Sequence, residues 1–253
     1  MLDRQTFLRP IAHRGLHDAA KGIVENTRPA FEAAIAKGYG IECDLQPAAD
    51  GTPLVFHDLT LERLTAGTGL ITSLQPACAA KLPFKHGGVT GILTFADFLA
   101  TIAGRVPIFA EIKSEWTEPD LGFLSEVARL SKLYRKPLAL MSFDPAVIAT
   151  IGRLAPDIPR GIVSGSYFDD DGTGWWPDSN LTDARRRALA SLLESGQANP
   201  SFYAYEVGAL PTAATQRVRR QGLPLLTWTV RTEDDRRVAA LNADAPIFEG
   251  YLP

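Results

Sequence analysis

The chain has 253 residues, 45% of them hydrophobic and 22% charged, and its formal net charge at pH 7 is −3. This length suits two small domains or one α/β barrel, and the charge argues against a dedicated nucleic-acid binder, which usually has a strongly basic face. The cysteines Cys43 and Cys78 are too few for a disulfide framework or a cysteine-based metal motif.

The N-terminal segment carries charged residues where a secretory signal peptide needs an apolar core. No apolar run approaches the roughly 18 residues that a membrane span needs. We therefore expect a cytoplasmic protein without a stable membrane anchor. The composition predicts no particular oligomeric state.

Short apolar runs alternate with helical patterns along nearly the whole chain. The apolar runs predict eight strands, at 9–13, 40–45, 106–112, 137–142, 158–164, 201–206, 224–230 and 246–249. The helical patterns predict seven helices, at 28–37, 94–103, 119–132, 144–155, 182–195, 211–221 and 232–243. This alternation favours parallel β-α-β units, and the chain length favours a closed (β/α)8 TIM barrel over an open doubly wound sheet. A closed barrel predicts a single domain, residues 1–253. Because the chain stops directly after the eighth strand, we expect no final helix.

Two segments interrupt the alternation. Residues 46–93 form a small insertion after the second strand, and a hairpin-like stretch, DGTPLVFHD, lies near its start. Residues 166–180 follow the fifth strand and are too long for a plain connection between a strand and a helix. Loops of this length are often functional.

Charged side chains stand at the ends of three neighbouring strands. In chain order the pairs are His13 and Arg14, Glu42 and Asp44, and Glu111 and Lys113. Residues i and i+2 of a strand point to the same face, and the C-terminal ends of barrel strands face the active site. Each pair alone is compatible with ordinary surface residues. Together with His57, in the loop after the second strand, they predict one polar site at the mouth of the barrel.

Such a site requires a cation. Three crowded carboxylates repel one another and take up protons unless a positive charge lies among them, so we expect a divalent ion. Ligation by oxygen alone favours Mg²⁺ or Ca²⁺ over zinc. With Arg14 and Lys113 beside it, the ion suits an anionic phosphoryl group. Two histidines can then deprotonate a nucleophilic hydroxyl and protonate the leaving alkoxide of a phosphodiester.

From about residue 10 to its end, the chain resembles the glycerophosphodiester phosphodiesterase family. The motifs that carry the resemblance, with the family's order and spacing, are IAHRG, ENT at 25–27, IECDLQPAADGTPLVFHDLTLERLTAGTG, FAEIK, MSFDP and LTWTV. The resemblance implies a TIM barrel with a small insertion after the second strand. It also implies metal-dependent hydrolysis of small glycerophosphodiesters to an alcohol and glycerol 3-phosphate.

The resemblance assigns roles to nine residues. They are metal ligands at Glu42, Asp44 and Glu111, an acid/base pair at His13 and His57, phosphate contacts at Arg14 and Lys113, and pocket positions at Glu25 and Trp228. Which histidine is the acid stays open. The nucleophile stays open too, and is either the substrate's own glycerol hydroxyl, which would form a cyclic phosphate, or water.

The C-terminal part departs from the family pattern. The family's WTV segment is usually followed by Asn, where this chain has Arg231, and its last strand commonly ends in Thr-Asp, where this chain has Glu249 and Gly250. Arg231 is either a third cation at the mouth, for a more anionic substrate, or an outward surface residue. Trp175 and Trp176 either shape the pocket for the alcohol or only pack the loop 166–180 against the barrel.

Three other functions remain as alternatives. A lysophospholipase D-like activity on membrane lysolipids would need an apolar groove or an aromatic patch at the mouth. A transferase or a cyclic-phosphate-forming lyase would share the same site. A non-catalytic phosphate-binding barrel is disfavoured because all three carboxylates and both histidines are present.

Overall fold

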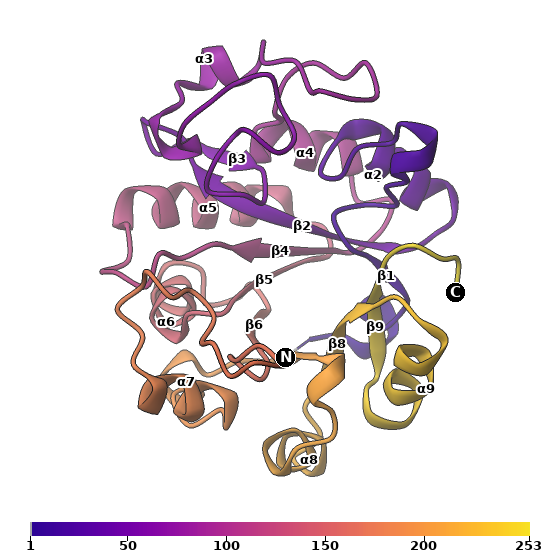
Figure 1. The fold of residues 1–253 in the computed structure, drawn as a ribbon, viewed down its shortest axis with the longest axis vertical. Helices are drawn as coiled ribbons and strands as arrows, with labels where there is room; N and C mark the ends of the chain where they lie inside the picture. The colour runs from indigo at the N-terminus through magenta and orange to yellow at the C-terminus, as the bar shows by residue number, and fades with distance from the viewer. Residues whose placement is uncertain (1) are drawn as a thin grey trace.

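The computed structural model describes residues 2–253, and they form a closed barrel. Eight parallel strands pair in chain order, and β1 closes the ring because it pairs with both β2 and β9. The barrel strands are β1 Ile11–Ala12, β2 Gly40–Pro47, β4 Ile108–Ile112, β5 Leu138–Ser142, β6 Arg160–Ser164, β7 Phe202–Glu206, β8 Leu225–Val230 and β9 Ala245–Phe248. Figure 1 shows this ring with helices around it. The predicted TIM barrel is confirmed.

Seven helices follow the barrel strands in the predicted order and cover the outside of the barrel (Figure 1). They are α2 Arg28–Ala36, α4 Phe95–Ile102, α5 Leu121–Tyr134, α6 Pro145–Leu154, α7 Asp183–Ala190, α8 Ala213–Arg220 and α9 Glu233–Asn242. Side-chain caps fix several of their starts; Asp144, for example, accepts a hydrogen bond from the amide of Ala146 at the start of α6. Residues 249–253, after β9, form no helix, as expected.

The insertion after β2 begins with a hairpin. Strand β3 (Pro53–Val55) pairs antiparallel with the second half of β2, and Gly51 takes a positive φ of 82° in the turn between them. This pairing brings the chain back along β2, so that His57 follows β3 at the mouth of the barrel. Further along, the insertion contains the short helix α3 (Pro76–Ala79) and a small hydrophobic cluster of its own around Leu54, Phe56, Leu61, Ile71 and Phe84.

A short N-terminal helix that the sequence patterns did not predict, α1 (Arg4–Phe7), closes the other end of the barrel. The ring of Phe7 lies 5.5 Å from that of Phe109, edge to face, and Phe109 packs in the same way on Phe202. Phe109 and Phe202 lie near the starts of β4 and β7, whereas Glu111 lies near the end of β4 and His13 and Lys113 directly follow β1 and β4. The barrel interior is therefore apolar at one end and polar at the other. None of the helices formed by residues 2–253 has both the length and the apolar character needed to cross a bilayer.

Candidate active site

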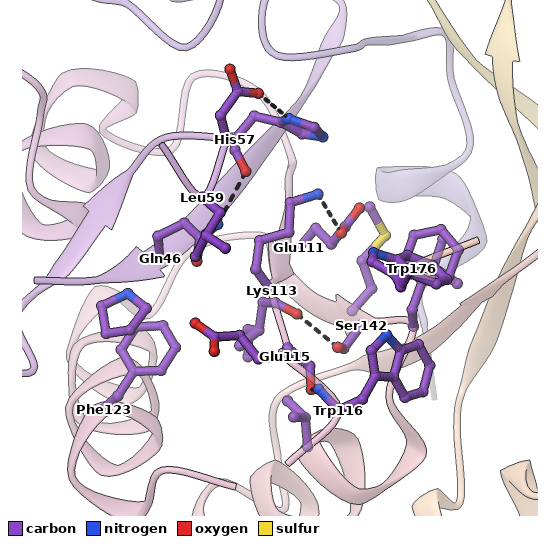
Figure 2. Close-up of a pocket in the computed structure, with 18 of the residues that line it drawn as sticks. Gln46, His57, Leu59, Glu111, Lys113, Glu115, Trp116, Phe123, Ser142 and Trp176 are labelled. Carbon is purple, nitrogen blue, oxygen red and sulfur yellow. Dashed lines mark hydrogen bonds and ion pairs between the residues drawn. The ribbon is translucent and has the colours of Figure 1, made fainter. Parts of the chain in front are cut away.

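A cavity of about 1240 Å³ lies at the C-terminal end of the barrel strands. Its polar side is lined by His13, Arg14, Glu42, His57, Glu111 and Lys113. Its opposite side carries aromatic residues, among them Trp116 and Trp176 (Figure 2). The sequence-predicted residues thus come together from several strands, at the place where TIM barrels hold their active sites.

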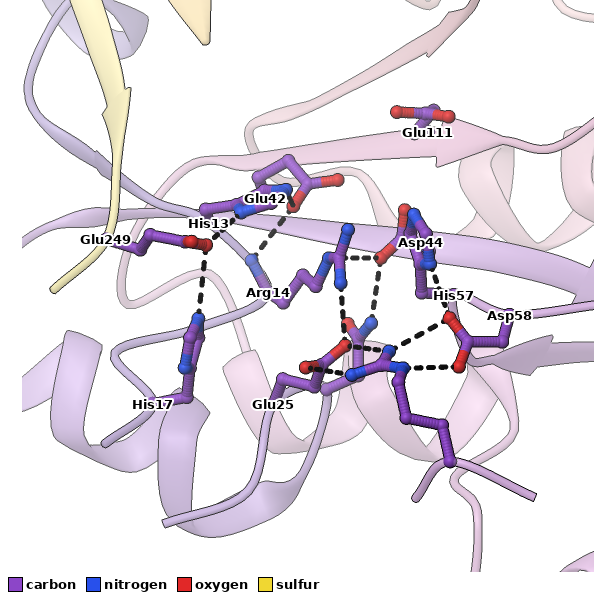
Figure 3. Close-up of polar contacts among 12 residues, drawn as sticks. His13, Arg14, His17, Glu25, Glu42, Asp44, His57, Asp58, Glu111 and Glu249 are labelled. Carbon is purple, nitrogen blue, oxygen red and sulfur yellow. Dashed lines mark hydrogen bonds and ion pairs between the residues drawn. The ribbon is translucent and has the colours of Figure 1, made fainter. Parts of the chain in front are cut away.

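Three carboxylates meet in the polar side of the site. Glu42 and Asp44 point to the same face of β2, and the strand register places Asp44 opposite Glu111 of β4. As a result, one carboxylate oxygen from each residue lies within 4.8 Å of the other two. All three side chains are buried. Figure 3 shows them converging beside the two histidines.

Two cations accompany the carboxylates. Nζ of Lys113 lies 2.7 Å from Oδ1 of Asp44 and 2.6 Å from Oε1 of Glu111. Nε of Arg14 lies 3.4 Å from Oδ2 of Asp44, and the Arg14 amide donates a hydrogen bond of 2.9 Å to Oε2 of Glu42. Arg14 takes a positive φ of 53° shortly after β1. The cations balance part of the negative charge.

The ionisation of the three carboxylates is uneven. Burial, together with the neighbouring charges of Asp44 and Glu111, raises the pKa of Glu42 well above its usual value. Burial also acts to raise the pKa of Asp44, but Lys113 and the other nearby cations outweigh it and hold that pKa below its usual range. The nearby cations therefore outweigh the effect of burial on the pKa of Asp44, but not on that of Glu42.

Two carboxylate oxygens fit a metal ion. Oε1 of Glu42 and Oδ1 of Asp44 are buried and have no hydrogen-bond partner, although Nζ of Lys113 is near the second of these. A buried acceptor without a partner costs about 1–3 kcal/mol, and more when it is charged. An all-oxygen donor set of this kind suits a hard divalent cation such as Mg²⁺ or Ca²⁺. The residues present are thus compatible with the predicted ion.

Both histidines of the predicted pair are anchored through Nδ1. His13 Nδ1 lies 2.5 Å from Oε2 of Glu249, and its Nε2 lies 3.9 Å from Oε2 of Glu42. His57 Nδ1 lies 2.7 Å from Oδ1 of Asp58. Burial lowers the pKa of His13, although the hydrogen bond with Glu249 opposes this effect. In both residues Nε2 is the nitrogen left to exchange a proton with a substrate.

Glu25 and the neighbouring Asn26 support the site from behind. Glu25 accepts hydrogen bonds from Nη1 of Arg14 at 2.7 Å and from both terminal nitrogens of Arg63 at 2.8 and 2.9 Å, and it does not line the cavity. Burial acts to raise its pKa, but the two arginines outweigh it and lower that pKa. Asn26 donates a hydrogen bond of 2.8 Å to Oδ2 of Asp44. The sequence signal for Asn26 was its place in the ENT motif.

The aromatic side of the cavity comes partly from the loop 166–180. Trp175 and Trp176 both line the cavity, and the ring of Trp175 lies 6.1 Å from that of Trp228 on β8. The ring of Phe143 packs on two of these tryptophans, with its centroid 5.1 Å from that of Trp176 and 5.4 Å from that of Trp228. Arg231 also lines the cavity, and its Nε donates a hydrogen bond of 2.7 Å to Oε1 of Glu249. Trp175 and Trp176 of the loop therefore pack on aromatic residues of the barrel and also face the cavity.

Comparison with known proteins gives the family. The model of the glycerophosphoryl diester phosphodiesterase family matches residues 13–248. The chain belongs to this family. The resemblance found in the motifs is therefore confirmed, and so is the expectation of a phosphodiesterase-type enzyme.

Two curated glycerophosphodiester phosphodiesterases illustrate the relationship. That of Caldanaerobacter subterraneus subsp. tengcongensis is 45% identical over 257 residues, covering 94% of this chain and 93% of the relative. Human glycerophosphodiester phosphodiesterase 1 is 44% identical over 255 residues, covering 89% of this chain and 72% of the relative. Among solved structures, a phosphodiesterase of Oleispira antarctica in complex with the product sn-glycerol-3-phosphate matches with a TM-score of 0.75 and 21% identity, over 95% of this chain and 92% of that one. This last similarity supports the fold.

Proposed function

We propose that the protein hydrolyses small glycerophosphodiesters to an alcohol and glycerol 3-phosphate, using a divalent cation and two histidines. One observation carries the proposal. Oxygens of Glu42, Asp44 and Glu111 converge within 4.8 Å of one another, and Glu42 and Glu111 line the same cavity as His13 and His57. Family membership supports the reaction, and the product named for the Oleispira antarctica relative supports glycerol 3-phosphate as the product here.

In this proposal Glu42, Asp44 and Glu111 would hold Mg²⁺ or Ca²⁺, which would polarise a phosphoryl oxygen and offset negative charge in the transition state. Arg14 and Lys113 bind the remaining phosphoryl oxygens, because both cations lie beside the carboxylates and line the cavity. The two ion pairs of Glu25 keep the guanidinium of Arg14 in place for this contact.

The histidines exchange protons through Nε2. One removes a proton from the attacking hydroxyl, which belongs either to the substrate's glycerol or to water, and the other donates a proton to the leaving alkoxide. An alkoxide is a poor leaving group, so both transfers matter for an alkyl phosphodiester. The carboxylates of Glu249 and Asp58 occupy Nδ1 of His13 and His57, which leaves Nε2 for this task.

The alcohol of the substrate lies against the aromatic wall in this proposal. Trp175, Trp176 and Trp228 offer flat apolar surfaces a short way from the carboxylates within the same cavity. The same wall favours one second candidate function, the lysophospholipase D-like cleavage of lysolipids, whose alcohol is larger and partly apolar.

One experiment tests the function and separates the candidates. Purified protein with Mg²⁺ or Ca²⁺ is given soluble glycerophosphodiesters, such as glycerophosphocholine, and lysophosphatidylcholine in liposomes, and glycerol 3-phosphate, lysophosphatidic acid and cyclic phosphates are measured. Glycerol 3-phosphate from the soluble substrates is the expected product. Lysophosphatidic acid as the main product would favour the second candidate. Calorimetric binding of the diester without any product would contradict the proposal and indicate a non-catalytic barrel.

A further inference from the structure

Three residues that follow paired strands meet at one edge of the site. Strand β9 pairs with β1 so that Ala12 is opposite Phe248, and it pairs with β8 so that Val230 is opposite Phe248. The residues that directly follow these three strands are therefore neighbours of one another. These residues are His13, Glu249 and Arg231. Two of them stand where the sequence departs from the family pattern.

Glu249 uses both of its carboxylate oxygens within this group. Oε2 accepts a hydrogen bond from Nδ1 of His13, at 2.5 Å, and Oε1 accepts one from Nε of Arg231, at 2.7 Å. His17 approaches Oε2 as well, at 3.4 Å (Figure 3). Burial acts to raise the pKa of Glu249, but the hydrogen bonds from the histidines and Arg231 outweigh it and lower that pKa. Glu249 is thus a half-buried, ionised and fully occupied carboxylate.

We propose that Glu249 and Arg231 are a positioning pair for His13, in which Glu249 fixes the tautomer and direction of the imidazole and Arg231 holds Glu249 in place. An ionised carboxylate only accepts hydrogen bonds, so Nδ1 of His13 carries the proton and Nε2 faces Glu42 and the cavity. This is how a buried carboxylate orients a catalytic histidine in other hydrolases. The inference rests on the proposed function, in which His13 transfers protons.

The second histidine has an equivalent arrangement. Asp58 accepts a hydrogen bond from Nδ1 of His57. Arg63 donates to both carboxylate oxygens of Asp58, at 2.6 and 2.9 Å. Each member of the histidine pair is therefore held by a carboxylate that an arginine holds in turn.

The contacts of Arg231 support its role in holding Glu249. Its Nε is used by Glu249, and its amide donates to Oδ2 of Asp235, which also caps the start of α9. Asp235 thus anchors the backbone of Arg231, and Glu249 anchors its side chain. Through Nε, the charge of Arg231 compensates that of Glu249.

A double-mutant cycle tests the positioning role. Glu249→Ala should lower kcat for a glycerophosphodiester by about 10- to 100-fold with little change in KM, the usual cost of losing a residue that orients a site group. In a His13→Ala background it should cause no further loss, because residues that act as a unit are not additive. Arg231→Ala should lower kcat less than Glu249→Ala and add nothing to it. A higher KM at unchanged kcat, or additive losses, would overturn the inference.

A measurement that needs neither metal nor turnover gives an independent test. The chain has four histidines, so the imidazole nitrogens can be resolved by NMR and those of His13 assigned with the His13→Ala variant. At alkaline pH His13 should be protonated at Nδ1 in the wild-type protein and a mixture of tautomers in Glu249→Ala. An unchanged tautomer in that variant would contradict the proposal.

Two controls make the result specific. The exposed ion pair between Glu32 and Arg105, 2.8 Å long, lies outside the cavity, so Glu32→Gln should change neither kcat nor the His13 spectrum. Thermal unfolding of each variant detects a general loss of structure. If the wild-type protein releases no glycerol 3-phosphate, the proposed function fails; the NMR comparison still decides whether Glu249 orients His13.

Discussion

Nζ of Lys113 lies 2.7 Å from Oδ1 of Asp44, an oxygen that is buried and lacks a hydrogen bond of good geometry. The lysine thus compensates part of the negative charge of the carboxylates. Burial acts to lower the pKa of Lys113, but Asp44 and Glu111 outweigh it and raise that pKa, so the ammonium group stays charged. A permanent cation beside a divalent ion is suited to binding a phosphodiester.

Removal of metal should abolish activity. Treatment with EDTA followed by desalting should reduce glycerol 3-phosphate release to background, and Mg²⁺ or Ca²⁺ should restore it, because the carboxylates alone present negative charge to an anionic substrate. The ion should also raise the unfolding temperature, since a ligand that binds only the folded state stabilises it. Full activity in protein shown to be metal-free by elemental analysis would rule out the proposed mechanism.

Glu42→Gln should separate function from stability. Oε1 of Glu42 is buried without a partner, and burial with neighbouring carboxylates raises its pKa, so the ionised side chain is unfavourable in the metal-free fold. The variant should lose at least about 100-fold in kcat/KM, consistent with loss of a metal ligand. Its metal-free form should unfold at a temperature equal to or above that of the wild-type protein. A lower temperature would show that Glu42 is stabilised by contacts within the protein.

The aromatic wall should control the choice of alcohol. Trp176→Ala removes a large part of the surface that faces the cavity between Trp116 and Phe143, whose rings lie 5.3 and 5.1 Å from it. We expect KM to rise about 10-fold for diesters with a bulky alcohol, which corresponds to one lost apolar contact of about 1.4 kcal/mol. A diester with a short alcohol serves as the control and should be unaffected. Equal changes for both would mean that the tryptophan only packs the loop.

The sequence predicts the barrel well because nearly every strand and helix has the hydrophobic periodicity typical of its type. Element ends are predicted less well. The helix expected over 182–195 ends at Ala190, because Leu192 takes a positive φ of 59°. Leu192 belongs to a hydrophobic cluster that includes Tyr203 and Tyr205 of β7. Strand β1 is shorter than expected, Ile11–Ala12 only. Its later start follows from Pro10, which has no amide to donate to a neighbouring strand.

The candidate site is predictable where single strands define it. The spacing of Glu42 and Asp44 already places both carboxylates on one face, and the register of adjacent strands then adds Glu111. The contact of Glu249 with His13 joins the last strand to the first, 236 residues apart in the chain. Local patterns do not contain such a contact, because it depends on closure of the barrel.

Phe7→Ala should destabilise the protein without removing its activity. The ring of Phe7 is only 5% exposed and packs on Phe109 inside the end of the barrel opposite the carboxylates. Loss of a buried phenylalanine costs about 3–5 kcal/mol through lost burial and the cavity left behind. We therefore expect a clear fall in the unfolding temperature, with kcat nearly unchanged well below it. Leu241→Ala is the matched control, because Leu241 is 76% exposed and its truncation should cost less than about 0.5 kcal/mol. Equal stability of the Phe7→Ala and wild-type proteins would show that α1 does not contribute to the barrel core.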